Sequence, residues 1–138
     1  MPLNLSAQDI EMNFEKVIFG FFVVLALTLN FGFFLGELDN PAHHSVFELF
    51  AVIIVNFIAT VLKFGDRSQI GAVLLATSLV ADLQLVTAAT YWTVVVHVTE
   101  TGLTPEVMAS IVSFTGGALI ANIISAVILV AETLMSRL

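Results

Sequence analysis

The sequence predicts an all-α integral membrane protein with four transmembrane helices. Of the 138 residues, 59% are hydrophobic and only 11% are charged, whereas soluble domains are about 45–50% apolar and about 25% charged. Four apolar segments, at residues 16–36, 46–64, 69–98 and 106–131, reach or approach the ~20 residues that a bilayer-spanning helix needs. We therefore expect residues 1–138 to form a single four-helix transmembrane domain.

The first helix is expected to begin before the membrane does. Ser6 and Asp9 have the spacing of a capping box, so residues 7–15 should form a cytoplasmic helical extension. Gly36 and the Glu-Leu-Asp-Asn-Pro that follows it end the first span. The acidic residues before this span are the reverse of the basic start of a signal peptide, so we expect the span to be retained.

Start and stop signals also bound the other three spans. Ser45 and Glu48 form a second capping box at the start of the second span, and Gly65 ends it. Gly102 closes the third span. Residues 104–106 (Thr-Pro-Glu) then provide an N-cap, a proline at the first helical position and a first-turn acid for the fourth span.

The basic residues predict that both termini are cytoplasmic. Lys16, Lys63, Arg67 and Arg137 are all the Lys and Arg residues of the chain. An N-in, C-in topology places each of them on the cytoplasmic side, with Lys63 and Arg67 in the turn between the second and third spans. We expect a multi-pass protein of the plasma membrane, which is the inner membrane if the cell is bacterial.

Five acidic residues then gather on the outer side, where no Lys or Arg accompanies them: Glu37, Asp39, Glu48, Glu100 and Glu106. A rim of one sign concentrates cations through its summed field. The alternative is that acids are free to lie outside because the sidedness rule mainly restricts Lys and Arg.

Composition excludes several classes of function. Without cysteine there is no disulfide, thiolate metal site or cysteine nucleophile, and a net charge of −7 argues against nucleic acid as a partner. We find no nucleophile–base pair and no cofactor motif, so we expect neither an enzyme nor a bound cofactor. His43 and His44 are a weak metal motif, and we expect them to lie in a solvated loop.

Asp82 is the residue that does not fit an apolar span. It lies in a run from Ile70 to Val98 with no other Asp, Glu, Lys or Arg. Asn56 and Asn122 lie near the middle of the second and fourth spans, and Asn30 lies about one turn outward in the first. A buried Asp costs about 2.5–3.5 kcal/mol on insertion scales, so it should face the interior with partners. We expect the three asparagines to be those partners.

Three states of this polar layer are open. Asp82 is ionised and holds a cation together with asparagine oxygens, or it is protonated and relays protons, or it is a purely structural hydrogen-bond donor. Gln84 points almost opposite to Asp82, since two residues turn a helix by 200°. Both faces of the third helix therefore look protein-contacting, which predicts a homo-oligomer. Gly116 and Gly117 either break the fourth helix or form a packing contact.

The sequence thus favours a small oligomeric cation channel or transporter, with the acidic outer rim as its mouth. Asp82, Asn56, Asn122, Asn30 and Gln84 are its candidate pathway residues, and its partners are the lipid bilayer and a monovalent or divalent cation or a proton. The alternative is a non-conducting membrane subunit of a larger complex, in which the polar layer holds helices together.

The predicted topology can be tested by labelling. Cysteines introduced at Ala42 and Thr101 should react with an impermeant thiol reagent added to intact cells, whereas a cysteine at Ser68 should not. Labelling at Ser68 in place of the other two positions would reverse the orientation.

Overall fold

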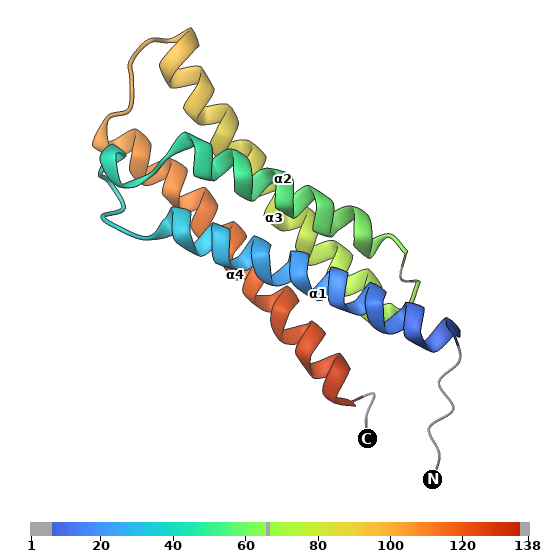
Figure 1. The fold of residues 1–138 in the computed structure, drawn as a ribbon. Coiled ribbons are helices and arrows are strands. Elements are labelled where there is room, and N and C mark those ends of the chain that lie inside the picture. The colour runs from blue at the N-terminus through green and yellow to red at the C-terminus, as the bar shows by residue number, and fades with distance from the viewer. Residues whose placement is uncertain (1–6, 66, 136–138) are drawn as a thin grey trace.

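Every regular element in the described part of the chain is a helix. The computed structural model describes residues 7–65 and 67–135, and the side chains from residue 14 onward. The order is α1 (Ala7–Phe34), a 3-10 turn η1 (Pro41–His43), α2 (Val46–Lys63), α3 (Gln69–Thr93), a π-helical continuation η2 (Val94–Val98) and α4 (Pro105–Met135), as Figure 1 shows. The proposed Ser6–Asp9 capping box and Arg137 lie outside the described side chains.

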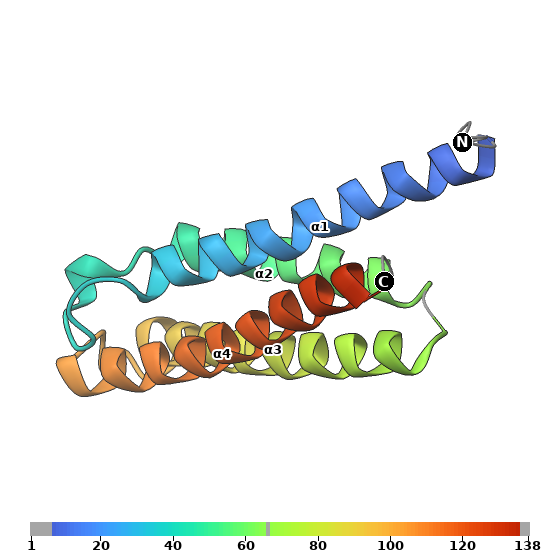
Figure 2. The same cartoon turned by 90° about the horizontal axis from the view of Figure 1, so that it is seen from below.

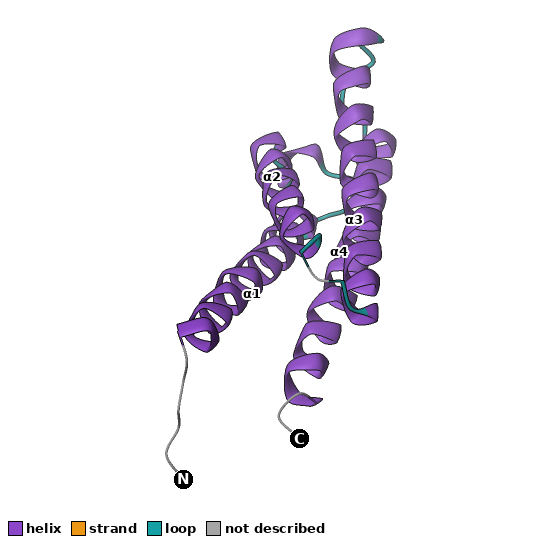
Figure 3. Cartoon of the chain, turned by 90° about the vertical axis from the view of Figure 1, so that its right-hand side faces the viewer, coloured by secondary structure: helices purple, strands orange, loops and turns teal. Residues whose placement is uncertain are grey.

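The four long helices form an antiparallel bundle. α1 and α3 each pack against both α2 and α4 (Figures 1 and 2). Figure 3 shows two pairs, α1 with α2 and α3 with α4, that diverge toward the end carrying both chain termini. We call this the terminal end, where the α2–α3 turn also lies. The opposite end, with the five acids Glu37, Asp39, Glu48, Glu100 and Glu106, is the acidic end.

The helix boundaries follow from the expected local chemistry. The Ser45 hydroxyl accepts a hydrogen bond from Phe47 N (3.2 Å) at the start of α2, and the Ser68 hydroxyl accepts one from Gly71 N (3.0 Å) at the start of α3. Gly36 and Gly102 follow α1 and η2 with φ of 96° and 79°, a conformation that glycine adopts without steric cost. Each cap or glycine therefore ends or starts a span at its predicted place.

The exposure of apolar side chains identifies the bundle as a membrane protein. All four helices are long and apolar enough to cross a bilayer, over Phe14–Phe34, Val46–Lys63, Gln69–Val98 and Pro105–Met135. In the most apolar stretch of each, only 22–33% of the residues are buried. Most of the apolar surface therefore faces outward, which a bilayer accommodates and water does not.

A packed apolar cluster fills the half of the bundle toward the acidic end. It includes Phe33 from α1, Leu49 and Val52 from α2, Leu85 from α3 and Ile111 from α4, each no more than 1% exposed. This cluster separates the middle of the bundle from the acidic end.

The two glycines of α4 form packing contacts, and the helix is continuous through them. A Cβ atom added to Gly116 would lie 2.9 Å from Cε2 of Phe34, and one added to Gly117 would lie 2.7 Å from Nε2 of Gln84. A larger side chain at these positions would displace the Phe34 ring of α1 or the Gln84 amide of α3. The packing alternative for these glycines is therefore correct.

His44 is not in a solvated loop, contrary to expectation. It is 3% exposed, with Nδ1 2.6 Å from the Phe33 carbonyl oxygen and Nε2 2.8 Å from the Glu37 carbonyl oxygen. A carbonyl oxygen can only accept, so a ring nitrogen that carries a proton donates to the carbonyl oxygen it faces. His43 is exposed and accepts from Glu37 N (2.8 Å).

His44→Ala should lower the free energy of unfolding by about 1–3 kcal/mol, because it leaves the Phe33 carbonyl oxygen, in the last turn of α1, without its buried partner. His43→Ala is the control. Its exposed ring contacts Glu37 N and Asn40 Nδ2, and water can replace the ring at both positions, so the loss should be smaller than for the buried His44. Reversible unfolding in mixed micelles, followed by circular dichroism, measures both. An equal effect of the two substitutions would contradict the role assigned to His44.

Candidate functional site

Asp82 lies buried in the middle of α3 and faces α2. It is 8% exposed, and its Oδ2 atom is 2.6 Å from the hydroxyl of Thr60, which donates to it. The same hydroxyl lies 2.8 Å from the backbone carbonyl oxygen of Asn56. The other carboxyl oxygen, Oδ1, is buried and has no hydrogen-bond partner among the described residues.

The Thr60 hydroxyl has fewer protons to donate than it has acceptor oxygens in contact with it. The Thr60 hydroxyl has one proton, yet it contacts two acceptor oxygens at hydrogen-bonding distance. A proton on the Asp82 carboxyl would satisfy both contacts, since the acid could then donate to the hydroxyl while the hydroxyl donates to Asn56. The site therefore has a place for one further proton.

Lys63 lies inside the bundle at the end of α2, so its expected position in the turn between the second and third spans is wrong. It is the last residue of α2 and is 3% exposed. Its ammonium group donates to the hydroxyl of Ser78 on α3 and to that of Ser125 on α4, the latter at 3.2 Å. Ser125 in turn lies 2.6 Å from the hydroxyl of Thr77. The ammonium group thus joins three helices.

Helical spacing explains why these groups meet. Asn56, Thr60 and Lys63 are at positions i, i+4 and i+7 of α2, so they form one stripe. Ser78 and Asp82 are at i and i+4 of α3 and form the facing stripe. Thr60 therefore meets Asp82 while Lys63, one turn closer to the terminal end, meets Ser78. The periodicity of the α2 stripe was the sequence signal that could have placed Lys63 in the site.

Lys63 and Asp82 lie about one helical turn apart on the facing stripes of α2 and α3, so their opposite charges attract each other. In a low-dielectric interior such an interaction is much stronger than in water. The ring of Phe19 on α1 completes the surroundings of Lys63, with its centroid 6.0 Å from the ammonium nitrogen. The site thus contains a buried acid and a buried base, each hydrogen-bonded to hydroxyl groups. We call these residues the Lys63–Asp82 network: Thr60, Lys63, Thr77, Ser78, Asp82 and Ser125.

Two of the predicted asparagines form a separate cluster between α1 and α4. With its amide oriented to suit its neighbours, Asn30 donates to the Thr115 carbonyl oxygen and accepts from Asn122 Nδ2 and Leu119 N, each at 3.0 Å. Asn56 Nδ2 donates to the Val52 carbonyl oxygen of its own helix at 3.0 Å. The hydrogen-bond partner of Asp82 is therefore a threonine, and not the asparagines that we expected.

Gln84 lies away from Asp82, as the helical geometry predicts, and packs against Gly117 of α4. The Asp82 face of α3 meets α2, and the Gln84 face meets α4. One chain therefore covers both faces, so they no longer require a second copy. Oligomerisation stays a prediction.

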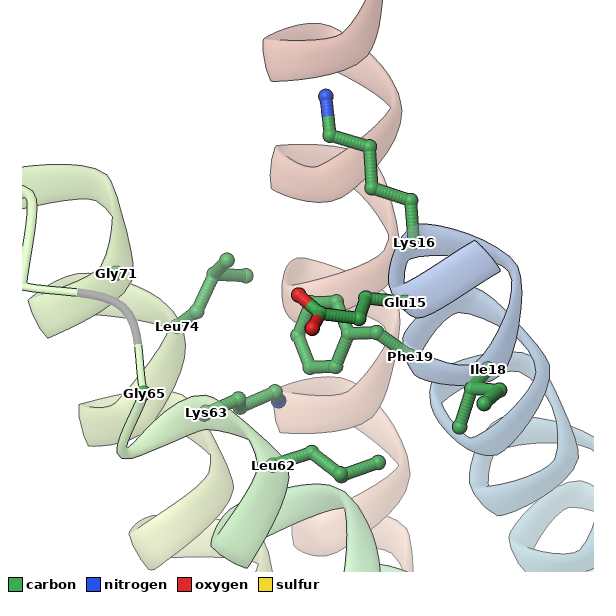
Figure 4. A pocket seen from close by; sticks show the side chains of 9 residues that line it. All are labelled: Glu15, Lys16, Ile18, Phe19, Leu62, Lys63, Gly65, Gly71 and Leu74. Carbon is green, nitrogen blue, oxygen red and sulfur yellow. The ribbon is translucent and has the colours of Figure 1, made fainter. Parts of the chain in front are cut away.

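The five predicted acids of the outer rim are all exposed and lie together at the acidic end. The Lys63–Asp82 network lies toward the opposite end, with the apolar cluster between the two. A pocket of about 570 Å³ opens at the terminal end, and Lys63 is part of its wall (Figure 4). The network is thus adjacent to a pocket on one side and to packed apolar side chains on the other.

The fold and the site together define a multi-pass, four-helix membrane protein with a buried acid–base network. Residues 43–133 match the model of a family of unknown function, DUF6394, and the chain belongs to this family. The match includes the whole Lys63–Asp82 network but excludes Phe19 and Asn30 of α1. No curated protein and no solved structure matches the chain.

The losses of unfolding free energy in the two single variants of the charged pair should together exceed the loss in the double variant. We expect Lys63→Met and Asp82→Asn each to destabilise the protein, since loss of one partner of a buried pair costs about 3–5 kcal/mol. In the double variant the two effects should fall short of additivity by about 0.5–3 kcal/mol. The pair Lys63→Met and Glu106→Gln, at opposite ends of the bundle, is the control and should be additive. Additivity in the first cycle would mean that the pair is not coupled.

Proposed function

We propose that this protein is a small membrane transporter that either moves protons or couples transport to proton movement. Asp82 and Lys63 are the groups that carry the proton. The observation behind this proposal is the contact between Asp82 Oδ2 and a hydroxyl that already has another acceptor. Ionisable groups inside membrane helices mark ion pathways and proton relays.

The order of the polar groups along the bundle supports this proposal. From the pocket at the terminal end, Lys63 leads to Ser78, and Asp82 follows one turn along the same face of α3. Lys63 can lose a proton, and hydroxyl groups both donate and accept. Transfer between Ser78 and Asp82 requires a change of side-chain rotamer or a bridging water, because no hydrogen bond joins these two side chains among the described residues.

The proton suits this site better than a metal cation. A cation site would have one carboxylate, and the ammonium group of Lys63 already interacts with that carboxylate. A second cation beside it would be repelled. A proton instead neutralises Asp82 and leaves its hydrogen bond with the Thr60 hydroxyl in place.

The apolar cluster favours a carrier over an open pore. It lies between the network and the acidic end, and a dry constriction blocks ions. The arrangement thus corresponds to a plasma-membrane transporter that is open toward the terminal end. We propose that this end faces the cytoplasm. In the same proposal, the acids of the opposite end attract cations to the outer surface. We also propose that the protein forms homo-oligomers and has no enzymatic activity.

The same apolar cluster favours a second candidate function. A bundle that is sealed across one half suits a non-conducting membrane subunit, in which the network holds α2, α3 and α4 together. Such a protein should co-purify with a different membrane protein and should conduct nothing by itself.

Proton flux into liposomes separates these two functions. Purified protein should acidify the lumen of liposomes that contain a pH-sensitive dye when a potential is applied with valinomycin and K⁺. The rate should follow the proton gradient and should not change when choline replaces Na⁺ outside the liposomes at constant external K⁺. Asp82→Asn should reduce flux to the level of empty liposomes, because the amide keeps the size of the side chain but cannot release a proton.

Thr60→Ser and Thr60→Val provide the matched comparison, because only the first keeps the hydroxyl. Flux should persist in Thr60→Ser and fall in Thr60→Val. Full flux in Asp82→Asn, or none in the wild-type protein, would contradict the transport proposal and favour the subunit.

A further inference from the structure

We infer that the pocket at the terminal end binds an anionic phospholipid, with the phosphate beside Lys16 and Lys63 and an acyl chain along the apolar wall. This site shares Lys63 with the proposed proton pathway, but the inference does not depend on proton transport. It rests on the depth, lining and charge of the pocket.

The length of α2 sets the depth of the pocket. Its 18 residues span about 27 Å, close to the ~30 Å thickness of the hydrocarbon core. Ser45 caps one end of this helix at one boundary of the membrane, so Lys63 at the other end lies at the opposite boundary. The phosphates of lipids lie at this level, and Lys63 meets them from the inside of the bundle.

The lining is that of an amphiphile site. The pocket, of about 570 Å³, is too large for an ion alone and is lined by residues of α1, α2, the α2–α3 turn and α3. Ile18, Phe19, Leu62 and Leu74 make its apolar wall. Figure 4 shows Lys63 reaching toward Phe19, the Glu15 carboxylate beside the Phe19 ring, and Lys16 at the rim on the α1 side with its ammonium group directed outward. Leu62 is 39% exposed, so this wall continues to the outer surface, where an acyl chain can enter from the bilayer.

The charge of the lining selects an anion. Lys16 and Lys63 contribute two positive charges, and Glu15 contributes one negative charge, which leaves a net charge of +1. One phosphodiester group would neutralise it. Asp82, the other acid near Lys63, is not part of the lining. Basic pockets between transmembrane helices on the cytoplasmic side bind acidic lipid head groups.

The divergence of the helix pairs provides the opening. Toward the terminal end, α1 separates from α3 (Figures 2 and 3), and the pocket lies between these two helices. A lipid here would cover the face of Lys63 that Phe19 now borders, and would therefore complete the enclosure of the ammonium group.

Native mass spectrometry of the full chain in mild detergent tests this inference. Titration with dioleoylphosphatidylglycerol should give one tightly bound lipid, and dioleoylphosphatidylcholine should bind more weakly. Lys16→Gln should lower the affinity for the anionic lipid about fivefold, the effect of one basic residue near a membrane surface. Arg67→Gln is the matched control, because it removes one positive charge at the same end but outside the pocket, and it should change little.

Leu62→Trp tests the acyl-chain part of the site without changing any charge. This half-exposed position tolerates a larger side chain, which should fill the pocket and reduce binding. Lys63→Gln should also reduce it, but Lys16→Gln and Leu62→Trp decide the outcome if that variant fails to fold. Equal affinity for the two lipids, an equal loss in Arg67→Gln, or inorganic phosphate occupying the site in place of lipid would each overturn the inference.

Discussion

The arrangement of this bundle depends on how the ammonium group of Lys63 is held inside an apolar protein. A buried and unpaired ion costs several kcal/mol, so the chain has to surround this one with hydroxyl groups and an opposite charge. Ser78 and Ser125 provide the hydroxyl groups from two other helices, and Asp82 provides the charge. These requirements fix the rotation of α2 about its axis, and that rotation turns Thr60 toward Asp82.

The two halves of the molecule are consequently different. Toward the terminal end, polar groups lie between the helices and a pocket opens beside them. Toward the acidic end, large apolar side chains from all four helices interlock, with Phe33 and Leu49 each 1% exposed. Asp82 lies at the border between these two environments. A group in that position is sensitive to small changes in hydration on one side only.

The fold was largely predictable from the sequence because its signals are local. Composition and apolar length identified the four spans, and Ser45 and Gly102 marked boundaries that the structure keeps. The depth of Asp82 and its separation from Gln84 also followed from helical periodicity. The partners of Asp82 did not, because hydrogen bonds between helices depend on their rotation and crossing, which a single sequence leaves undetermined.

Lys63 shows this difference most clearly. A lysine at the end of an apolar span normally extends to the membrane surface, and the positive-inside rule predicts Lys63 in the turn after the second span. Only the assembled bundle shows that Ser78 and Ser125 make the inward direction favourable. His44 is a similar case, because its burial depends on the backbone carbonyl groups at the end of α1, which carry no sequence signal.

The way in which α1 is attached has a mechanical consequence. Its polar link to the other helices in the membrane interior is at Asn30, which bonds to residues of α4, whereas its terminal half borders the pocket through Ile18 and Phe19. The hydrogen bonds of Lys63 and Asp82 come from α2, α3 and α4 alone. Asn30 is thus placed as a pivot, about which the terminal half of α1 can swing without breaking any of those bonds. The position of α1 therefore controls how far Lys63 is exposed, whereas α2, α3 and α4 hold the network around it together.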